Sequence, residues 1–171
     1  LSTDTEIASD LIELFNYLSG FSKQKNYKKL LVSPFSMRKK FIYLIIRETN
    51  NAKEGKKAEI IAKMNSLVDP EIINLLYEAS KEGVKIKLII RGICCLIPKK
   101  IGLSENIEVI SVIGHFLEHS RIFWFCNNDD HEVFIGSADW MRRNLDRRIE
   151  AVTPIEDYEL KSQLHSLLQT Y

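Results

Sequence analysis

The 171 residues suffice for one domain with a hydrophobic core, and a composition of 45% hydrophobic and 27% charged residues is typical of a globular protein. The formal net charge of +1 excludes recognition of a polyanion by overall charge, so an anion site would have to be built from local clusters. The sequence has no apolar run of about 18 residues, which argues against a transmembrane helix.

The N-terminal segment predicts a helix, because apolar residues recur at helical spacing up to Gly20, a typical helix end. Thr3 and Glu6 fit a capping box at its start. The basic stretch SKQKNYKK then predicts a linker. We therefore expect residues 1–29 to form an N-terminal helix and basic linker, and residues 30–171 to form the main domain. Because the chain begins with Leu rather than Met, we expect a fragment of a longer protein.

Short strands and helices alternate in the next part of the chain. The segments LLVSP and AEIIAKM predict buried strands. A helix from Ser36 to about Thr49 lies between them, with one apolar face. Asp69 followed by Pro70 predicts the start of another helix, which ends at Gly83.

From Val84 onward the hydrophobic pattern changes to the period of two that is typical of strands. Strands are predicted for VKIKLIIR, IEVISVI, RIFWFC, EVFIGS and RIEAVT, and a last helix for the leucine-rich segment from Leu160 to Tyr171. Strands that first alternate with helices and then follow one another closely predict an α/β fold with a mixed β-sheet flanked by helices.

The three cysteines, Cys94, Cys95 and Cys126, have an odd count and no metal-ligand spacing. We therefore expect reduced thiols in a cytoplasmic protein, with Cys94 and Cys95 packed as small core residues. The pattern predicts no metal ligand in this chain.

Four polar residues mark the candidate site: His119, Arg121, Ser137 and Asp139. Residues two apart on a strand project from the same face, so we expect each pair to share a face of one of two neighbouring strands. The turn-forming loop NNDDHE predicts a hairpin that brings the pairs together. A His can exchange a proton near neutral pH, and an Arg offers bidentate donors to phosphate. The combination favours a phosphoryl-handling site, although Ser137 alone also fits a strand-end hydroxyl, and Asp139 a helix cap or an arginine partner.

The motif formed by these residues resembles that of the phospholipase D-type enzymes, which carry His-x-Lys followed by Gly-Ser-x-Asn. Arg121 replaces the Lys, Asp139 replaces the Asn, and Cys126 stands where that family has an Asp. These departures argue against simple phosphodiester hydrolysis.

The departures match one subgroup, the bacterial polyphosphate kinases. The chain resembles this family from about Leu30 through Leu160, in the runs LVSP, KMNSLVD, IRGICCLIP, LSENI, FLEHSRIF and GSADWMRRNLDRRIE. The resemblance implies an enzyme that transfers the terminal phosphoryl group of ATP reversibly to inorganic polyphosphate. It also implies that this chain is the phospholipase D-like C-terminal half of a paired site. The phosphohistidine and the magnesium ligands would lie in a preceding domain, and the isolated fragment would be inactive.

The resemblance assigns roles to individual residues. Arg91 would contact the nucleotide phosphates, although an exposed strand-end Arg is an equally ordinary interpretation. His119 would contact the phosphates or donate a proton, and Arg121 would neutralise phosphoryl charge. Lys63 and Asn65 would line the same pocket, or would be ordinary strand-end residues. Structural roles are expected for His115, His131 and His165.

Three functions remain open at this point: the C-terminal domain of a polyphosphate kinase, a phospholipase D-like phosphodiesterase or nuclease paired by dimerisation, and a non-catalytic module that binds polyphosphate or nucleotide. For the first, the expected partners are ATP or ADP, polyphosphate and the upstream domains, with a homo-oligomer left open and no nucleic acid. The expected location is the cytoplasm, with membrane association of the parent protein left open.

Overall fold

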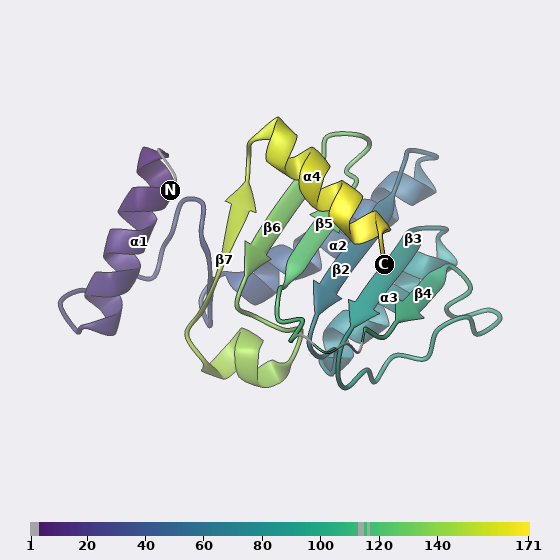
Figure 1. Cartoon of the computed structure of the whole chain (residues 1–171), viewed down its shortest axis with the longest axis horizontal. Helices are drawn as coiled ribbons and strands as arrows, with labels where there is room; N and C mark the ends of the chain where they lie inside the picture. Colours follow the sequence, from purple (N-terminus) through teal and green to yellow (C-terminus); the bar gives the residue numbers. More distant parts are fainter. Residues whose placement is uncertain (1–3, 113–114, 116) are drawn as a thin grey trace.

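A mixed seven-stranded β-sheet organises residues 4–112, 115 and 117–171, which the computed structural model describes (Figure 1). Its strands lie in the order β1 (Leu31–Ser33), β7 (Glu150–Ile155), β6 (Glu132–Gly136), β5 (Ile122–Phe125), β2 (Glu59–Met64), β3 (Lys85–Ile90) and β4 (Ile107–Ile110). β2, β3 and β4 are parallel, and the other neighbouring pairs are antiparallel. The predicted mixed sheet is confirmed.

Helices cover both faces of this sheet. α2 (Met37–Lys53) and α3 (Pro70–Lys81) lie behind it in Figure 1, whereas α4 (Tyr158–Gln169) crosses the front face. α1 (Thr5–Leu18) stands beside the β1 and β7 end, and a short π-helix, η1 (Arg143–Arg147), connects β6 to β7. None of the described helices is long and apolar enough to cross a membrane.

The larger hydrophobic core lies between the sheet and the helices α2 and α3. Three fully buried aromatic rings meet there, with centroid distances of 4.7 Å from Phe41 to Phe123, 5.5 Å from Phe41 to Trp140 and 5.3 Å from Phe123 to Trp140. The next residue, Trp124, packs into the second cluster, beneath α4. Successive residues of β5 therefore fill both cores, as expected for a strand that is covered on both faces.

The caps of the helices explain where they begin. Asp69 accepts a hydrogen bond from Ile72 N–H at 3.1 Å and begins α3, as predicted. For α1 the cap is Asp4, whose carboxylate accepts from the N–H groups of Glu6 and Ile7. The predicted cap, Thr3, lies outside the described residues.

A buried carboxylate fastens the linker to α1. Asp10 accepts hydrogen bonds from three consecutive backbone N–H groups, those of Lys28 (3.0 Å), Lys29 (2.7 Å) and Leu30 (2.9 Å). Leu14 of α1 packs with Leu30 in a small separate cluster. The linker thus folds back on the helix. The division of the chain at residue 29 remains a prediction.

The outer side of β1 is occupied by the turn that follows it. Val32 N–H donates to Ser36 Oγ at 3.2 Å, and Val32 O accepts from the N–H groups of Phe35 (3.0 Å) and Ser36 (2.9 Å). Ser36 stands at the start of α2, as predicted, but its side chain serves the strand and makes no cap hydrogen bond.

The expected core packing of the cysteine pair is wrong in part. Cys95 is exposed and Cys94 only half-buried, whereas Cys126 is buried. The pair follows β3, where the chain has left the sheet. A backbone hydrogen bond from Cys95 N–H to Leu67 O holds this segment in place at 2.9 Å.

The topology creates one edge where many strand ends meet. β2, β3, β4 and β6 end there, and β5 and β7 begin there, because β2 is parallel to β3 and antiparallel to β5. This site edge is the lower edge in Figure 1. At the opposite edge, called here the hairpin edge, the loop between β5 and β6 turns the chain.

Candidate active site

Every predicted site residue lies at the site edge. Lys63 lies near the end of β2 and Asn65 follows that strand, Arg91 follows β3, His119 and Arg121 precede β5, and Ser137 and Asp139 follow β6. The predicted hairpin is confirmed, since β5 and β6 pair antiparallel. The predicted strand positions of the four motif residues are wrong, because they lie just outside the strands.

The predicted shared face of Ser137 and Asp139 is also wrong. Ser137 is exposed, whereas Asp139 is buried. Asp139 Oδ1 accepts hydrogen bonds from Asn65 N–H at 2.9 Å and from Arg121 Nε at 3.1 Å. Because both partners of this ion pair are nearly buried, the carboxylate fixes the guanidinium to the end of β2. Asp139 is thus an arginine partner, one of the two structural roles expected for it.

Arg121 in turn holds the imidazole of His119. Its Nη1 lies 2.9 Å from Nδ1 and 3.3 Å from Nε2, and donates to the carbonyl oxygen of His119 at 2.7 Å. A guanidinium can only donate, so in the tautomer that accepts at Nδ1, the nearer nitrogen, a neutral ring carries its proton on Nε2. Nη2 of Arg121 has no hydrogen-bond partner among the described residues. This ordered pair therefore keeps donors available to a ligand.

Ser137 belongs to a second network. Its hydroxyl donates to Glu150 at the start of β7, and the other oxygen of that carboxylate accepts from Asn144 Nδ2 at 2.6 Å. Gly136 precedes it because a Cβ at this position would lie 2.4 Å from Ala151 O on β7. Sequence reasoning missed Glu150 and Asn144 as individual residues, although both fall within the run GSADWMRRNLDRRIE.

Lys63 is buried and paired. Its ammonium donates to Glu118 at 2.9 Å and to Ser120 Oγ at 2.7 Å, and lies 5.4 Å from the centroid of the Tyr171 ring. The hydrogen bond from Lys63 lowers the pKa of the Glu118 carboxyl, and Tyr171 O–H donates to the same carboxylate at 3.2 Å. These contacts fix the segment that carries His119. Sequence reasoning missed Glu118 and Tyr171, since neither belongs to the motif.

Arg91 and Asn65 lie where β3 and β2 end. The half-exposed Arg91 side chain has no hydrogen bond or ion pair with any described residue. The buried Oδ1 of Asn65 also lacks a hydrogen-bond partner in the described part of the chain. Since β2 separates β3 from β5, Arg91 and Arg121 leave the sheet about 10 Å apart. A chain of linked phosphates could span that separation.

The other histidines lie apart from this group. Both His131 and His165 pack against Trp124, at ring-centroid distances of 4.7 Å and 4.8 Å, and only the His165 ring is stacked on it. His115 is exposed, and residues beside it lie outside the described ranges.

The carboxylates of the site edge do not fit a magnesium site. Glu118 is paired with Lys63, Asp139 with Arg121, and Glu150 with Ser137 and Asn144. Magnesium prefers open carboxylate oxygens in octahedral geometry, and these are already bound to donors. The expectation that magnesium ligands lie elsewhere stays a prediction.

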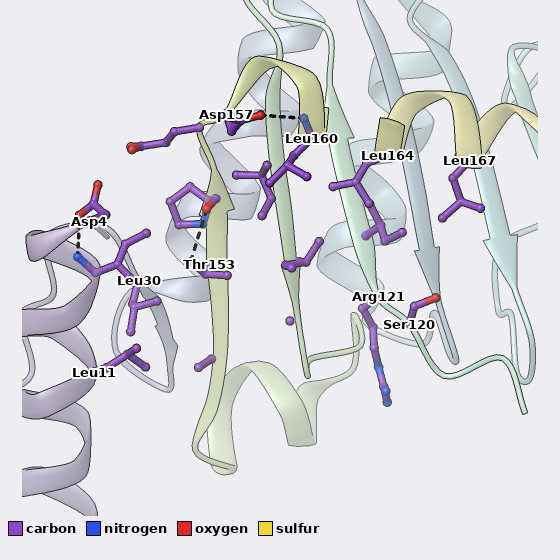
Figure 2. Close-up of a pocket in the computed structure, with 18 residues that line it drawn as sticks. Asp4, Leu11, Leu30, Ser120, Arg121, Thr153, Asp157, Leu160, Leu164 and Leu167 are labelled. Carbon is purple, nitrogen blue, oxygen red and sulfur yellow. Dashed lines mark hydrogen bonds between the residues drawn. The ribbon is translucent and has the colours of Figure 1, made fainter. Parts of the chain in front are cut away.

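A groove of about 1230 Å³ runs from α1 to the site edge over β7, β6 and β5. In Figure 2, Leu160, Leu164 and Leu167 of α4 line its upper side, and Arg121 lies at its lower end. The groove is mostly apolar and opens beside the Arg121 and His119 pair.

Comparisons with known proteins agree with this architecture. A family model described as "Polyphosphate kinase C-terminal domain 2" matches residues 30–171. The polyphosphate kinase of Prochlorococcus marinus (strain MIT 9313) is 61% identical over the whole chain, which covers 24% of that protein. The polyphosphate kinase of Dictyostelium discoideum is 48% identical over 99% of the chain and 16% of its own length.

Solved structures show the same similarity. The polyphosphate kinase of Porphyromonas gingivalis superimposes with a TM-score of 0.94 at 43% identity, over 98% of this chain and 26% of that one. The phospholipase D family member Nuc of Salmonella typhimurium matches with a TM-score of 0.58 at 18% identity, over 83% of this chain and 91% of its own, which shows a shared fold. The chain thus spans 24% of the length of the Prochlorococcus marinus relative and 16% of that of the Dictyostelium discoideum relative.

Proposed function

Because the chain belongs to the polyphosphate kinase family, we propose that it supplies the phospholipase D-like C-terminal half of a kinase active site. The complete enzyme would transfer the terminal phosphoryl group of ATP reversibly to inorganic polyphosphate. The observation that carries this proposal is the position of Arg91, His119 and Arg121 at one sheet edge, with donors that have no partner among the described residues.

Phosphoryl transfer depends mainly on positioning and on stabilising charge on the phosphoryl oxygens. Arg121 is suited to this task because Asp139 holds its Nε, which leaves Nη2 to donate to a phosphate oxygen. His119 would offer Nε2–H as a hydrogen-bond or proton donor. Arg91 would bind the nucleotide phosphates from the neighbouring strand end.

The phosphoryl carrier in this proposal is a His in a preceding domain. The support is that the chain spans about a quarter of its bacterial relatives' length and carries one such motif. The partners would be ATP or ADP, polyphosphate and those upstream domains, with magnesium ligands also upstream. We further propose a cytoplasmic location. Self-association and membrane contact of the whole protein stay open to measurement.

The test replaces His119 in the full-length protein. His119→Ala should lower the rate of polyphosphate synthesis about 10²- to 10⁴-fold, the usual contribution of a positioned acid or base. The matched control is His115→Ala, an exposed His four residues earlier, which should retain synthesis. Synthesis at the wild-type rate in His119→Ala would contradict the proposal, and cleavage of a generic phosphodiester by wild-type protein would favour a phosphodiesterase.

A further inference from the structure

A second cluster of polar side chains lies at the hairpin edge, far from the motif. The thiol of Cys126, the carboxylate of Asp129 and the imidazole of His131 place one ligand atom each within 4.8 Å of one another. All three residues come from the single loop that joins β5 to β6. They offer a sulfur, an oxygen and a nitrogen donor at one point.

The backbone of this loop is held in an unusual conformation. Asn127, Asn128 and Asp129 have φ values of 46°, 53° and 71°, in the left-handed region that Asn and Asp adopt more readily than other residues with a Cβ. The turn brings the carboxylate of Asp129 back toward the thiol of Cys126. Three consecutive residues keep this conformation only where surrounding contacts impose it.

The surrounding contacts are present. Asn127 N–H donates to the buried carboxylate of Glu48 at 2.9 Å, and Cys126 N–H donates to Glu59 O at 2.9 Å. Asn128 N–H donates to Lys57 O at 3.2 Å. The loop is therefore anchored to α2 and to the chain around the start of β2.

Each donor group is oriented and still has capacity for a ligand. Lys57 Nζ donates to Oδ2 of Asp129 at 2.7 Å, and Oδ1 has no hydrogen-bond partner among residues 4–112, 115 and 117–171. Neither ring nitrogen of His131 has a hydrogen-bond partner among the described residues, while the ring itself is held against Trp124. Cys126 is a free thiol that is 5% exposed. Partners that orient metal ligands without occupying their donor atoms strengthen metal sites.

We propose that Cys126, Asp129 and His131 bind a divalent transition-metal ion, with zinc the best match. Thiolate, imidazole and carboxylate are the donors that zinc takes in tetrahedral sites, and water would complete the fourth position. Magnesium and calcium prefer sites made of oxygen donors only. Sulfur and nitrogen ligands of one zinc ion lie about 3.5 Å apart, so small side-chain rotations close the site. Binding forms the metal–sulfur bond and releases the thiol proton to solvent.

This site would act on the hairpin rather than on the substrate. The metal would join the end of β5 to the start of β6, the two strands whose other ends lead to Arg121 and Asp139. It is independent of the proposed kinase activity. The proposed site also differs from the expectation that this chain holds no metal ligand. That expectation rests on the spacing of the cysteines, and the usual cysteine-based spacing patterns do not include a C-x-x-D-x-H loop.

The test uses cobalt(II) as a spectroscopic probe. The reduced, chelator-treated chain should bind one cobalt ion and develop a thiolate-to-cobalt charge-transfer band together with tetrahedral visible bands. Zinc should displace cobalt, whereas millimolar magnesium should leave the bands unchanged. Zinc at about a hundredfold excess over its dissociation constant should raise the Tm by about 5–10 °C.

Matched variants assign the ligands. Cys126→Ser and His131→Gln should each weaken cobalt binding at least about 100-fold, because losing a ligand exceeds the effect of losing a supporting contact. Cys95→Ser, at an exposed thiol, and His165→Gln, at the other imidazole on Trp124, should retain binding. His131→Gln removes a half-buried side chain and keeps the test valid if Cys126→Ser does not fold.

The absence of a thiolate band in the wild-type chain would overturn the proposal. Survival of the band in Cys126→Ser, or its loss in Cys95→Ser, would do the same, because the sulfur would then come from another residue.

Discussion

The two edges of the sheet are both rich in charged residues, yet they use charge differently. At the hairpin edge, the fully buried Glu48 has hydrogen-bond donors on both oxygens, from Asn127 N–H and Glu59 N–H. At the site edge, Arg121 is held through Nε and Nη1, while Nη2 has no partner in the described part of the chain. The enclosed carboxylate of Glu48 holds two backbone N–H groups in place, whereas a charge held on one side can also bind a ligand.

The largest expected effect follows from the incompleteness of the site edge. The isolated 171-residue chain should fold but form no polyphosphate from ATP, because the proposed phosphoryl carrier lies in another domain. Incubation with ATP, magnesium and a polyphosphate primer would be followed for chain growth and for phosphate on His119. The full-length protein is the positive control. Growth by the isolated chain would place the carrier in this domain.

Removing the partner of Arg121 should have the next largest effect. Asp139→Ala leaves a nearly buried guanidinium without its carboxylate, which typically costs about 3–5 kcal/mol in the free energy of unfolding. Urea unfolding measures this loss. The control at the hairpin edge is Lys57→Met, which breaks an exposed pair with Asp129 and should lower the free energy of unfolding far less. Equal losses would mean that burial of the Arg121 and Asp139 pair does not increase its contribution to stability.

Arg91 should affect binding more than folding. Arg91→Ala should weaken nucleotide binding about 10- to 100-fold, the usual effect of losing a hydrogen bond to a charged group. Its side chain has no described partner, so the Tm should change little. Calorimetric titration and thermal unfolding measure the two quantities. A lower Tm at unchanged affinity would assign Arg91 a structural role instead.

The smallest expected effect is a pH dependence at the hairpin edge. Burial raises the pKa of the Glu48 carboxyl above its ordinary value, against the opposing effect of its hydrogen bonds. Folding therefore favours the protonated carboxyl of Glu48. The stability that results is fully present below the unfolded-state pKa and is lost as the pH rises through the folded-state pKa. Relative to Glu48→Gln, the wild type should lose free energy of unfolding over that rise. Parallel pH profiles of the two proteins would show that the carboxyl does not titrate differently on folding.

The sequence predicted the elements well where local chemistry determines them. Asp69 with Pro70 located α3, and alternating apolar residues located β3 and β5. The sequence also identified side chains that lie at the site edge, because the motif residues stand directly before β5 and directly after β6. It could not supply the orientation of those side chains. Whether Asp139 turns inward depends on Asn65, 74 positions away in sequence.

Long-range partners account for the other omissions. Glu118, Glu150 and Tyr171 belong to no distinctive local pattern. Their roles become visible only in the folded protein, through contacts with residues distant in the sequence. The same holds for Cys95, which packing leaves exposed, and for the loop of Cys126, which three left-handed residues close.

The turn after β1 also occupies backbone groups on the unpaired side of that strand. β1 is the outermost strand on its side of the sheet, and such strands offer unpaired backbone groups to other chains. Here the outward N–H and C=O of Val32 are already bonded to Ser36 and Phe35. A strand from another molecule would therefore find no unpaired N–H or C=O group at the middle of β1. We expect this edge strand to resist amyloid-like pairing with other chains.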